Sequence, residues 1–355
     1  MRVGILTSGG DCQALNATMR GLALTLYRNV KDVEIIGFID GYKGLMYEKY
    51  KKMKPKDFYD ILNVGGSILG NSRCPFKRMR IIENGFDKVK AMKNTYKKLE
   101  LDCLVVLGGN GSIKSANMLS QEGLNVIALP KTIDNDAWGT DYTFGYSSAT
   151  AIATRYLDEI KTTAASHSRV FVIEVMGHKV GHICLSAGIA AGADVILLPE
   201  IPYDIKVVAK KVKETLKNEK NYAIIACAEG AISEADALMK RKDYKAKVLA
   251  RNDRSVAYEV ADELSQEIDA EIRVSCIGHA QRGGNPDSYD REISTRFGVE
   301  GARLIIKKHY GEYVVLQGNH VTHIPLEATA GKLKFVDTEG EIVQSAKLVG
   351  ISFGE

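Results

Sequence analysis

The chain has 355 residues, of which 45% are hydrophobic and 26% are charged, and its formal net charge at pH 7 is +4. These values are typical of a soluble globular protein, and the length predicts two domains rather than one. No apolar run is long enough to cross a membrane, and the chain starts in a predicted strand rather than a signal peptide, so we expect a cytoplasmic protein.

Strands and helices are predicted to alternate along the chain. Apolar runs predict strands at residues 2–7, 33–39, 103–108, 125–130, 170–175, 194–198, 222–227 and 272–277. The spacing of apolar residues predicts amphipathic helices at 13–29, 87–98, 112–121, 147–163 and 204–218, and a long exposed helix within 231–262. This alternation is typical of parallel βαβ units, whose ligands bind beyond the carboxyl ends of the strands.

Three polar or glycine-rich segments directly follow predicted strands, at residues 8–11, 108–112 and 130–136. Glycine pairs allow the backbone to approach a ligand closely, and backbone amides at a strand-to-helix turn form a cradle for anions. The two commonest nucleotide motifs, GxxxxGK[ST] and GxGxxG, are absent. We therefore expect three strand ends to converge on one phosphate-binding site.

Two carboxylates, Asp134 and Asp136, lie one residue apart in the third of these segments. In an extended segment their side chains would point to the same side, about 7 Å apart. One could accept a proton from an alcohol that attacks phosphorus, while the other holds Mg²⁺ or orients the first. The structural alternative is that Asp-Asn-Asp forms an Asx-turn or a helix cap.

The second half of the chain supplies cations suited to a sugar phosphate. Arg169 and Arg273 lie at the starts of predicted strands, and Arg282 belongs to a glycine-rich segment, residues 278–284, that follows another. Guanidinium groups clamp phosphate oxygens in pairs. A single arginine of this kind is more often part of a surface ion pair, but three of them favour a binding site.

Seven ordered segments together resemble the phosphofructokinases over essentially the whole chain. They are residues 7–11, 65–73, 108–112, 130–136, 166–169, 174–177 and 278–284. This family transfers a phosphoryl group from ATP or pyrophosphate to the 1-hydroxyl of fructose 6-phosphate, with Mg²⁺. The resemblance implies an α/β fold of two doubly wound, Rossmann-like domains with mostly parallel sheets and the active site in the cleft between them. Residues 1–145 and about 281–331 would bind the phosphoryl donor, and residues 146–280 and about 332–355 the sugar phosphate.

The resemblance also assigns roles to individual residues. The catalytic residues would be Asp134 as general base, Thr132, Asp136 and Arg73, the last neutralising charge that develops during transfer. Donor-binding positions are Gly10, Arg73, Cys74, Gly109, Asn110, Gly111, Ser112 and Lys131, and Mg²⁺ would be held by Asn110 and Asp136. Positions on the sugar-phosphate side are Thr132, Asp134, Arg169, Met176, Gly177, His178, Glu229, Arg273, His279 and Arg282. In this family the arginines at the positions of Arg169 and Arg273 reach a neighbouring subunit's site, which implies a homo-oligomer, commonly a tetramer.

Two positions depart from the common family pattern. Asn110 stands where ATP-using members carry aspartate; its amide oxygen can coordinate Mg²⁺ but adds no charge, so we expect a raised Mg²⁺ requirement. His178 stands where many relatives have arginine, so we expect acceptor binding to strengthen as the pH falls and the imidazole becomes charged. Both departures leave open another class of protein, a catalytically weak sensor of sugar phosphate or nucleotide. The retained Asp134, Asp136 and Arg282 argue against that alternative.

The choice of donor depends on Gly111 and Lys131. In this family an aspartate at the first position and a lysine at the second mark pyrophosphate users, because they occupy the space of the nucleotide's α-phosphate. Here the glycine leaves that space open while the lysine matches the pyrophosphate pattern. A lysine can swing aside on its flexible stem, whereas an aspartate repels a phosphate, so we favour ATP and keep pyrophosphate as the alternative. The acceptor could also be sedoheptulose 7-phosphate, whose chemistry at carbon 1 is similar.

Overall fold

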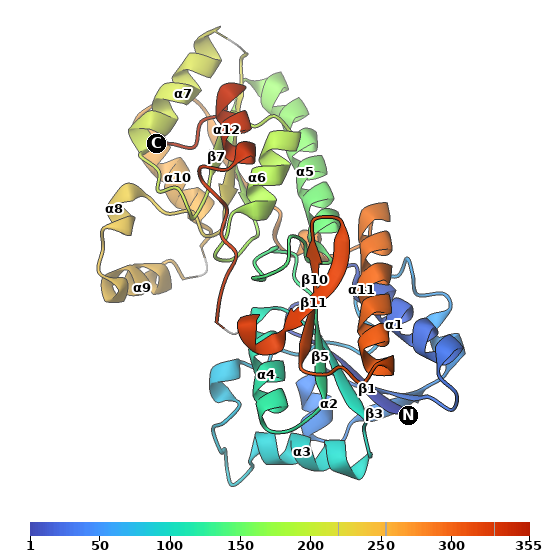
Figure 1. Ribbon diagram of the computed structural model, residues 1–355. Coiled ribbons are helices and arrows are strands. Elements are labelled where there is room, and N and C mark those ends of the chain that lie inside the picture. The colour runs from blue at the N-terminus through green and yellow to red at the C-terminus, as the bar shows by residue number, and fades with distance from the viewer. Residues whose placement is uncertain (219, 253, 330) are drawn as a thin grey trace. The chain divides into compact units, whose positions relative to one another are not determined.

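The computed structural model describes residues 1–218, 220–252, 254–329 and 331–355. These residues form two compact units, each traced in Figure 1. Unit 1 comprises residues 1–148 and 282–334, and unit 2 comprises residues 149–281 and 335–355. The assignment of the two domains to the phosphoryl donor and the sugar phosphate stays a prediction. No helix among the described residues is both long and apolar enough to cross a membrane.

Unit 1 is built on a seven-stranded sheet in the order β11-β10-β5-β4-β1-β2-β3. The strands are β1 (Arg2–Ser8), β2 (Glu34–Phe38), β3 (Tyr50–Met53), β4 (Cys103–Gly108), β5 (Val126–Pro130), β10 (Glu312–Gln317) and β11 (His320–Pro325). The five central strands pair in parallel, and β3 and β11 pair antiparallel at the two edges. Because β1, β4 and β5 are parallel neighbours, the loops that follow them lie along one edge of the sheet.

Helices cover this sheet, and glycine allows two of them, α1 and α11, to pack closely together. The helices of unit 1 are α1 (Leu15–Asn29), α2 (Tyr42–Met46), α3 (Lys88–Lys98), α4 (Asn110–Gln121) and α11 (Ser288–Ile306). Figure 1 shows α1 and α11 side by side. A Cβ on Gly21 would lie 2.7 Å from the carbonyl oxygen of Thr295, and one on Gly298 would lie 2.3 Å from that of Thr18. The two backbones therefore approach more closely than any larger residue allows.

Unit 2 contains a four-stranded, fully parallel sheet in the order β7-β8-β6-β9. Its strands are β6 (Val170–Val175), β7 (Val195–Leu197), β8 (Ala223–Ala228) and β9 (Ile272–Cys276). The helices are α5 (Tyr146–His167), which begins in unit 1, α6 (His182–Ala190), α7 (Ile205–Asn218), α8 (Glu234–Ala237), α9 (Arg241–Ala250), α10 (Val256–Ser265) and α12 (Glu341–Leu348). Side chains of β6, β8, α7 and α10 form one buried apolar core.

All eight predicted strands and all five predicted amphipathic helices are confirmed, with small shifts at their ends. The expectation of one long exposed helix within 231–262 is wrong, because this stretch contains α8, α9 and the start of α10. The Ser233 side chain accepts from the backbone N–H of Asp236, and that of Ser255 from Ala257, so each serine caps a new helix. In α10, Val260 is buried, so this helix belongs to the core and is not an exposed surface helix.

Candidate functional site

Three loops meet at the carboxyl edge of the unit 1 sheet. Ser8 of β1 is in register with Gly108 of β4, and Gly108 with Pro130 of β5. The loops are also close to one another beyond the strands: a Cβ on Gly9 would lie 3.6 Å from Nζ of Lys131. The predicted convergence of three strand ends is therefore confirmed.

Lys131 is the buried cation of this cluster. Its side chain is 3% exposed, and its ammonium donates a hydrogen bond to the carbonyl of Gly10. Burial lowers the pKa of Lys131, since the charged form loses its hydration, and the cation of Arg282 acts in the same direction. The lysine is thus held against the first glycine loop by the protein's own backbone.

Arg282, predicted on the sugar-phosphate side, lies in unit 1 against the same glycine loop. Its Nη1 donates to the carbonyl of Asp11 at 2.9 Å, and Gln13 Nε2 donates to the carbonyl of Gly283 at 3.0 Å. A Cβ on Gly10 would lie 2.8 Å from the same Nη1. Because Gly10 has no side chain, the guanidinium of Arg282 can lie at this position.

The second glycine loop begins α4. Gly109 is the N-cap, and Asn110, Gly111 and Ser112 form the first turn, where backbone N–H groups have no partner within the helix. Gly111 is exposed, and a Cβ built on it meets nothing within 4 Å. The first turn of a twelve-residue helix, open at this glycine, is suited to an anion such as a phosphate.

Arg73 is exposed, and its neighbours bring it to the first glycine loop. The carbonyl of Ser72 accepts from the backbone N–H of Gly9 at 3.1 Å. Cys74, on the other side of Arg73, is partly buried against the apolar core of unit 1. The backbone on both sides of the arginine is thus anchored, while its side chain extends towards solvent.

The loop after β5 carries the two carboxylates. Thr132 Oγ1 accepts from the backbone N–H of Asp134 at 3.1 Å, and the carbonyl of Thr132 accepts from Thr143 Oγ1 at 2.7 Å. Asn135 has a φ of +54°, in the left-handed region, which asparagine tolerates better than most residues. The segment is therefore not extended, and the expectation that Asp134 and Asp136 share one side by strand alternation is wrong.

Two residues that support this loop were not foreseen. The Lys334 ammonium donates to Asn135 Oδ1 at 3.0 Å, and burial lowers the pKa of Lys334 to about 8. The carboxylate of Asp290, on α11, accepts from the backbone N–H of Gly145 and from Ser148 Oγ. Burial raises the pKa of Asp290 above its usual value, although these donors act against the shift. Such contacts join positions 142 to 199 residues apart, so no local spacing indicates them.

In unit 2 the loops after β6 and β8 meet through Glu229. Its Oε1 accepts from the backbone N–H groups of Gly177, at 3.1 Å, and of His178. The backbone N–H of Met176 donates to Gln281 Oε1 at 3.0 Å. His178 is exposed and has a φ of +54°. Four of the predicted sugar-phosphate residues, Met176, Gly177, His178 and Glu229, are therefore neighbours at the carboxyl edge of this sheet, and His279, also exposed, follows β9 at the same edge.

Arg169 and Arg273 lie around one carboxylate on the opposite edge of the same sheet. The Glu271 carboxylate forms an ion pair with Arg169 Nε at 2.9 Å and a second ion pair with Arg273. The side chain of Arg273 is 52% exposed. The structure thus brings the two predicted arginines together, and their contact with another subunit stays a prediction.

The predicted Mg²⁺ ligands, Asn110 and Asp136, offer only oxygen. Asn110 Nδ2 donates to the carbonyl of Lys332 at 3.0 Å, so the amide nitrogen is engaged and Oδ1 is the atom suited to a cation. Among the described residues, no group of three or more His, Cys, Asp or Glu side chains could hold a metal ion. A sparse set of oxygen donors fits Mg²⁺, which keeps several waters and binds substrate phosphates rather than an all-protein cage.

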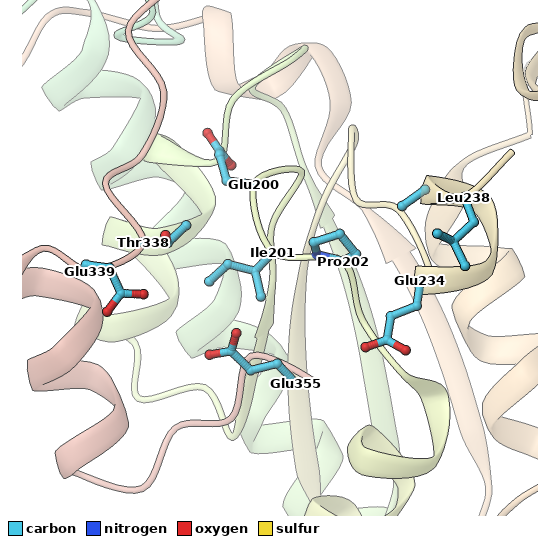
Figure 2. Close-up of a pocket in the computed structure, with 9 residues that line it drawn as sticks. Glu200, Ile201, Pro202, Glu234, Leu238, Thr338, Glu339 and Glu355 are labelled. Atoms are coloured by element: carbon cyan, nitrogen blue, oxygen red, sulfur yellow. The ribbon is translucent and has the colours of Figure 1, made fainter. Parts of the chain in front are cut away.

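Unit 2 also contains a cavity of about 470 Å³ near its C-terminal segment (Figure 2). It is lined by Glu200, Ile201, Pro202, Glu234, Ala237, Leu238, Thr338, Glu339 and Glu355. None of the predicted site residues is among them. The four glutamates give this cavity a negative lining, which disfavours a phosphorylated ligand.

Comparison with known proteins identifies related sequences over the full length of the chain. The family model described as phosphofructokinase matches residues 2–305. The ATP-dependent 6-phosphofructokinase of Spirochaeta thermophila is 46% identical, over 99% of this chain and 97% of that protein. ATP-dependent 6-phosphofructokinase 3 of Bacteroides thetaiotaomicron is 42% identical over the whole of both chains.

Solved structures share the fold. The phosphofructokinase of Saccharomyces cerevisiae superposes with a TM-score of 0.80 at 28% identity, over 93% of this chain and 45% of that longer one. The pyrophosphate-dependent phosphofructokinase of Marinobacter aquaeolei has the same TM-score at 19% identity, over 96% of this chain and 87% of that one. The predicted fold class, two Rossmann-like α/β domains with mostly parallel sheets, is confirmed.

Proposed function

Since this chain belongs to the phosphofructokinase family, we propose that it is an ATP-dependent 6-phosphofructokinase. It transfers the γ-phosphoryl group of ATP to the 1-hydroxyl of fructose 6-phosphate and forms fructose 1,6-bisphosphate and ADP. The observation that carries this proposal is the 46% identity, over nearly the whole chain, to a protein named for that activity.

The donor binds to the three loops of unit 1 in this proposal. The amides of Gly10, of the N-cap Gly109 and of the first turn of α4, residues 110–112, face the phosphates, and the helix dipole favours their negative charge. Arg73 neutralises charge that develops on the transferred group. Support for this assignment comes from the adjacency of β1 and β4 and from the open space at Gly111.

The chemical step uses the loop after β5. The Asp134 carboxylate takes the proton of the sugar 1-hydroxyl as that oxygen attacks the γ-phosphorus. A bond forms between the sugar oxygen and phosphorus, and the bond to the oxygen that bridges the β- and γ-phosphates breaks, so that ADP leaves. Thr132, whose hydroxyl accepts from the backbone of Asp134, orients this carboxylate.

A phosphotransferase of this kind needs a divalent cation, for which we propose Mg²⁺. Asn110 and Asp136 would hold it, and the ion would neutralise phosphate charge and orient the donor. Both side chains present oxygen, the ligand atom that Mg²⁺ prefers.

The sugar phosphate binds to unit 2. Met176, Gly177 and Glu229 contact the sugar, and His178 and His279 supply polar groups nearby. The two hydrogen bonds that the Glu229 carboxylate accepts from the loop after β6 support this assignment, because they fix the loop's shape. We further propose a homo-oligomer in which Arg169 and Arg273 bind the sugar phosphate held by a neighbouring subunit; their joint position beside Glu271 supports a common role.

ATP is preferred to pyrophosphate as the donor for two reasons. The relatives that are 42% and 46% identical are both named ATP-dependent. In addition, Gly111 opens on free space, while the ammonium of Lys131 is engaged by the carbonyl of Gly10. A pyrophosphate-dependent enzyme is the second candidate, since Lys131 itself matches that pattern.

The role of Asp134 provides a test of the proposed function. Asp134→Asn keeps the size of the side chain but removes the proton acceptor, so turnover should fall by about 100-fold or more while ATP binding persists. Turnover is measured as fructose 1,6-bisphosphate formed, and ATP binding by calorimetry. A variant with unchanged turnover would refute the assignment.

A further inference from the structure

The last residues of unit 1 lie along the loop that carries the two carboxylates. Leu333 forms an antiparallel bridge with Ala137, and the backbone N–H of Lys334 donates to the carbonyl of Asp136 at 2.9 Å. We call residues 332–334 the strap. The strap therefore pairs with the loop that follows β5, although Lys334 and Asn135 are 199 residues apart in the chain.

The side chain of Lys334 makes the strap's most extensive polar contact. Its ammonium donates to Asn135 Oδ1 at 3.0 Å, to the carbonyl of Thr140 at 2.9 Å and to the carbonyl of Asp141 at 2.8 Å. An ammonium has three protons, so these three acceptors match its donor capacity. One partly buried nitrogen therefore ties together two ends of the loop, residues 135 and 140–141.

The first of these acceptors belongs to Asn135, which stands between Asp134 and Asp136 in the sequence. Asn135 has the left-handed φ of +54°, a conformation that non-glycine residues keep only where surrounding contacts hold it. Its side-chain oxygen is held by Lys334, with Thr143 Oγ1 at the longer distance of 3.5 Å. The backbone at Asn135 sets the directions in which Asp134 and Asp136 leave the loop.

We propose that Lys334 is a positioning residue for phosphoryl transfer, whose ammonium holds the loop of residues 134–141 in the conformation that directs Asp134 and Asp136. This role goes beyond the proposed function, and its effect on catalysis rests on that function. The inference that Lys334 holds the loop rests on the hydrogen bonds alone.

The chain contains a single tryptophan, Trp138, and it lies within this loop. Its side chain is 38% exposed, and Nζ of Lys332 lies 4.0 Å from its ring centroid. The intrinsic tryptophan fluorescence of the protein therefore reports on the loop alone, with no added label and no need for turnover.

Lys334→Met removes the ammonium and keeps an unbranched side chain. The matched control is Lys307→Met, in which an exposed lysine just after α11 undergoes the same change. In Lys334→Met we expect kcat with ATP and fructose 6-phosphate to fall ~10- to 100-fold with KM for ATP nearly unchanged, as for a reacting group displaced by about 1 Å. We also expect Trp138 to become more accessible to acrylamide quenching. The control should match the wild type in both measurements.

A thermal unfolding curve of each variant shows whether the protein is folded under the conditions of these measurements. A Lys334→Met protein that is folded and keeps wild-type kcat, or that keeps wild-type quenching of Trp138, would overturn the proposal. A raised KM with an unchanged kcat would also contradict it, because that result places Lys334 in ground-state binding. If the wild type itself transfers no phosphoryl group, the proposed function fails, and the quenching comparison still decides whether Lys334 holds the loop.

Discussion

Arg282 Nη1 lies 2.9 Å from the carbonyl oxygen of Asp11 and would lie 2.8 Å from a Cβ on Gly10, so one guanidinium occupies the space that a glycine leaves open. The residue that the family pattern puts on the sugar side is thereby packed on the first glycine loop of unit 1. A glycine at position 10 is therefore needed to make room for Arg282, whether or not a ligand also approaches there.

Gly10→Ala should therefore act through Arg282. The new methyl group displaces the end of a flexible side chain rather than backbone, so the melting temperature should change little, while kcat/KM falls roughly tenfold or more because Arg282 moves. A double-mutant cycle with Arg282→Met measures this coupling: the alanine should cost much less activity once the arginine is gone. Equal losses in both backgrounds would show that Gly10 acts independently of Arg282.

Gly111→Asp tests donor choice without disturbing the fold, since a Cβ at this position meets no atom within 4 Å. We expect kcat/KM with ATP to fall roughly 100-fold, because two like charges about 4 Å apart repel by several kcal/mol near a protein surface. The rate with pyrophosphate should change far less. Measuring both donors on one preparation checks this, and a loss of equal size with each donor argues against the steric and electrostatic account.

Asn110→Asp should lower the Mg²⁺ concentration at half-maximal rate several-fold, because a carboxylate adds a charge that the amide lacks. It should also lower the stability of the protein by about 1 kcal/mol, since aspartate cannot donate the hydrogen bond that Asn110 Nδ2 gives to the carbonyl of Lys332. A Mg²⁺ titration of the rate and a thermal melt measure the two effects. An unchanged titration curve would remove Asn110 from the metal site.

The burial of the Glu200 carboxyl predicts that the free energy of unfolding depends on pH. Burial raises the pKa of this carboxyl above its usual 4.5, so the folded protein binds the proton more tightly than the unfolded chain does. The stability that Glu200 contributes is therefore fully present below its usual pKa of 4.5 and is lost as the pH rises through its pKa in the folded protein. Glu200→Gln keeps an oxygen that can accept from the backbone N–H groups of Gly181 and Val336 but does not ionise.

Glu200→Gln should therefore lose less stability than the wild type as the pH rises above the usual carboxyl pKa of 4.5, as unfolding in urea at several pH values would reveal. Glu339→Gln, an exposed residue on the same cavity, serves as the control and should follow the wild type. If Glu200→Gln and the wild type lose stability in parallel, Glu200 does not titrate as its burial implies.

The sequence predicts those parts of the site that are set by local pattern. Apolar runs followed by glycine-rich or polar segments identify the ends of β1, β4 and β5, and parallel pairing then brings these ends together. The left-handed backbone at Asn135 leaves no comparable signal, because asparagine is also common where φ is negative. The hydrogen bond from Lys334 to Asn135 joins residues 199 apart in the chain, so only the folded structure reveals it.

The helices of unit 2 also could not be fully predicted from the local sequence. Residues 231–262 have few helix breakers, which is why a single helix is expected there. Two serines, Ser233 and Ser255, decide the outcome by capping α8 and α10 through their side chains. Serine is polar and common on exposed helices as well, so its capping role depends on the backbone conformation that surrounds it.

The function proposed for this protein is the transfer of a phosphoryl group from ATP to fructose 6-phosphate. The most direct test is the initial rate of fructose 1,6-bisphosphate formation from fructose 6-phosphate and Mg²⁺, with ATP and pyrophosphate supplied in parallel reactions. We predict turnover with ATP and a much lower rate with pyrophosphate. Turnover with pyrophosphate alone, or with neither donor, would show that the proposed function is wrong.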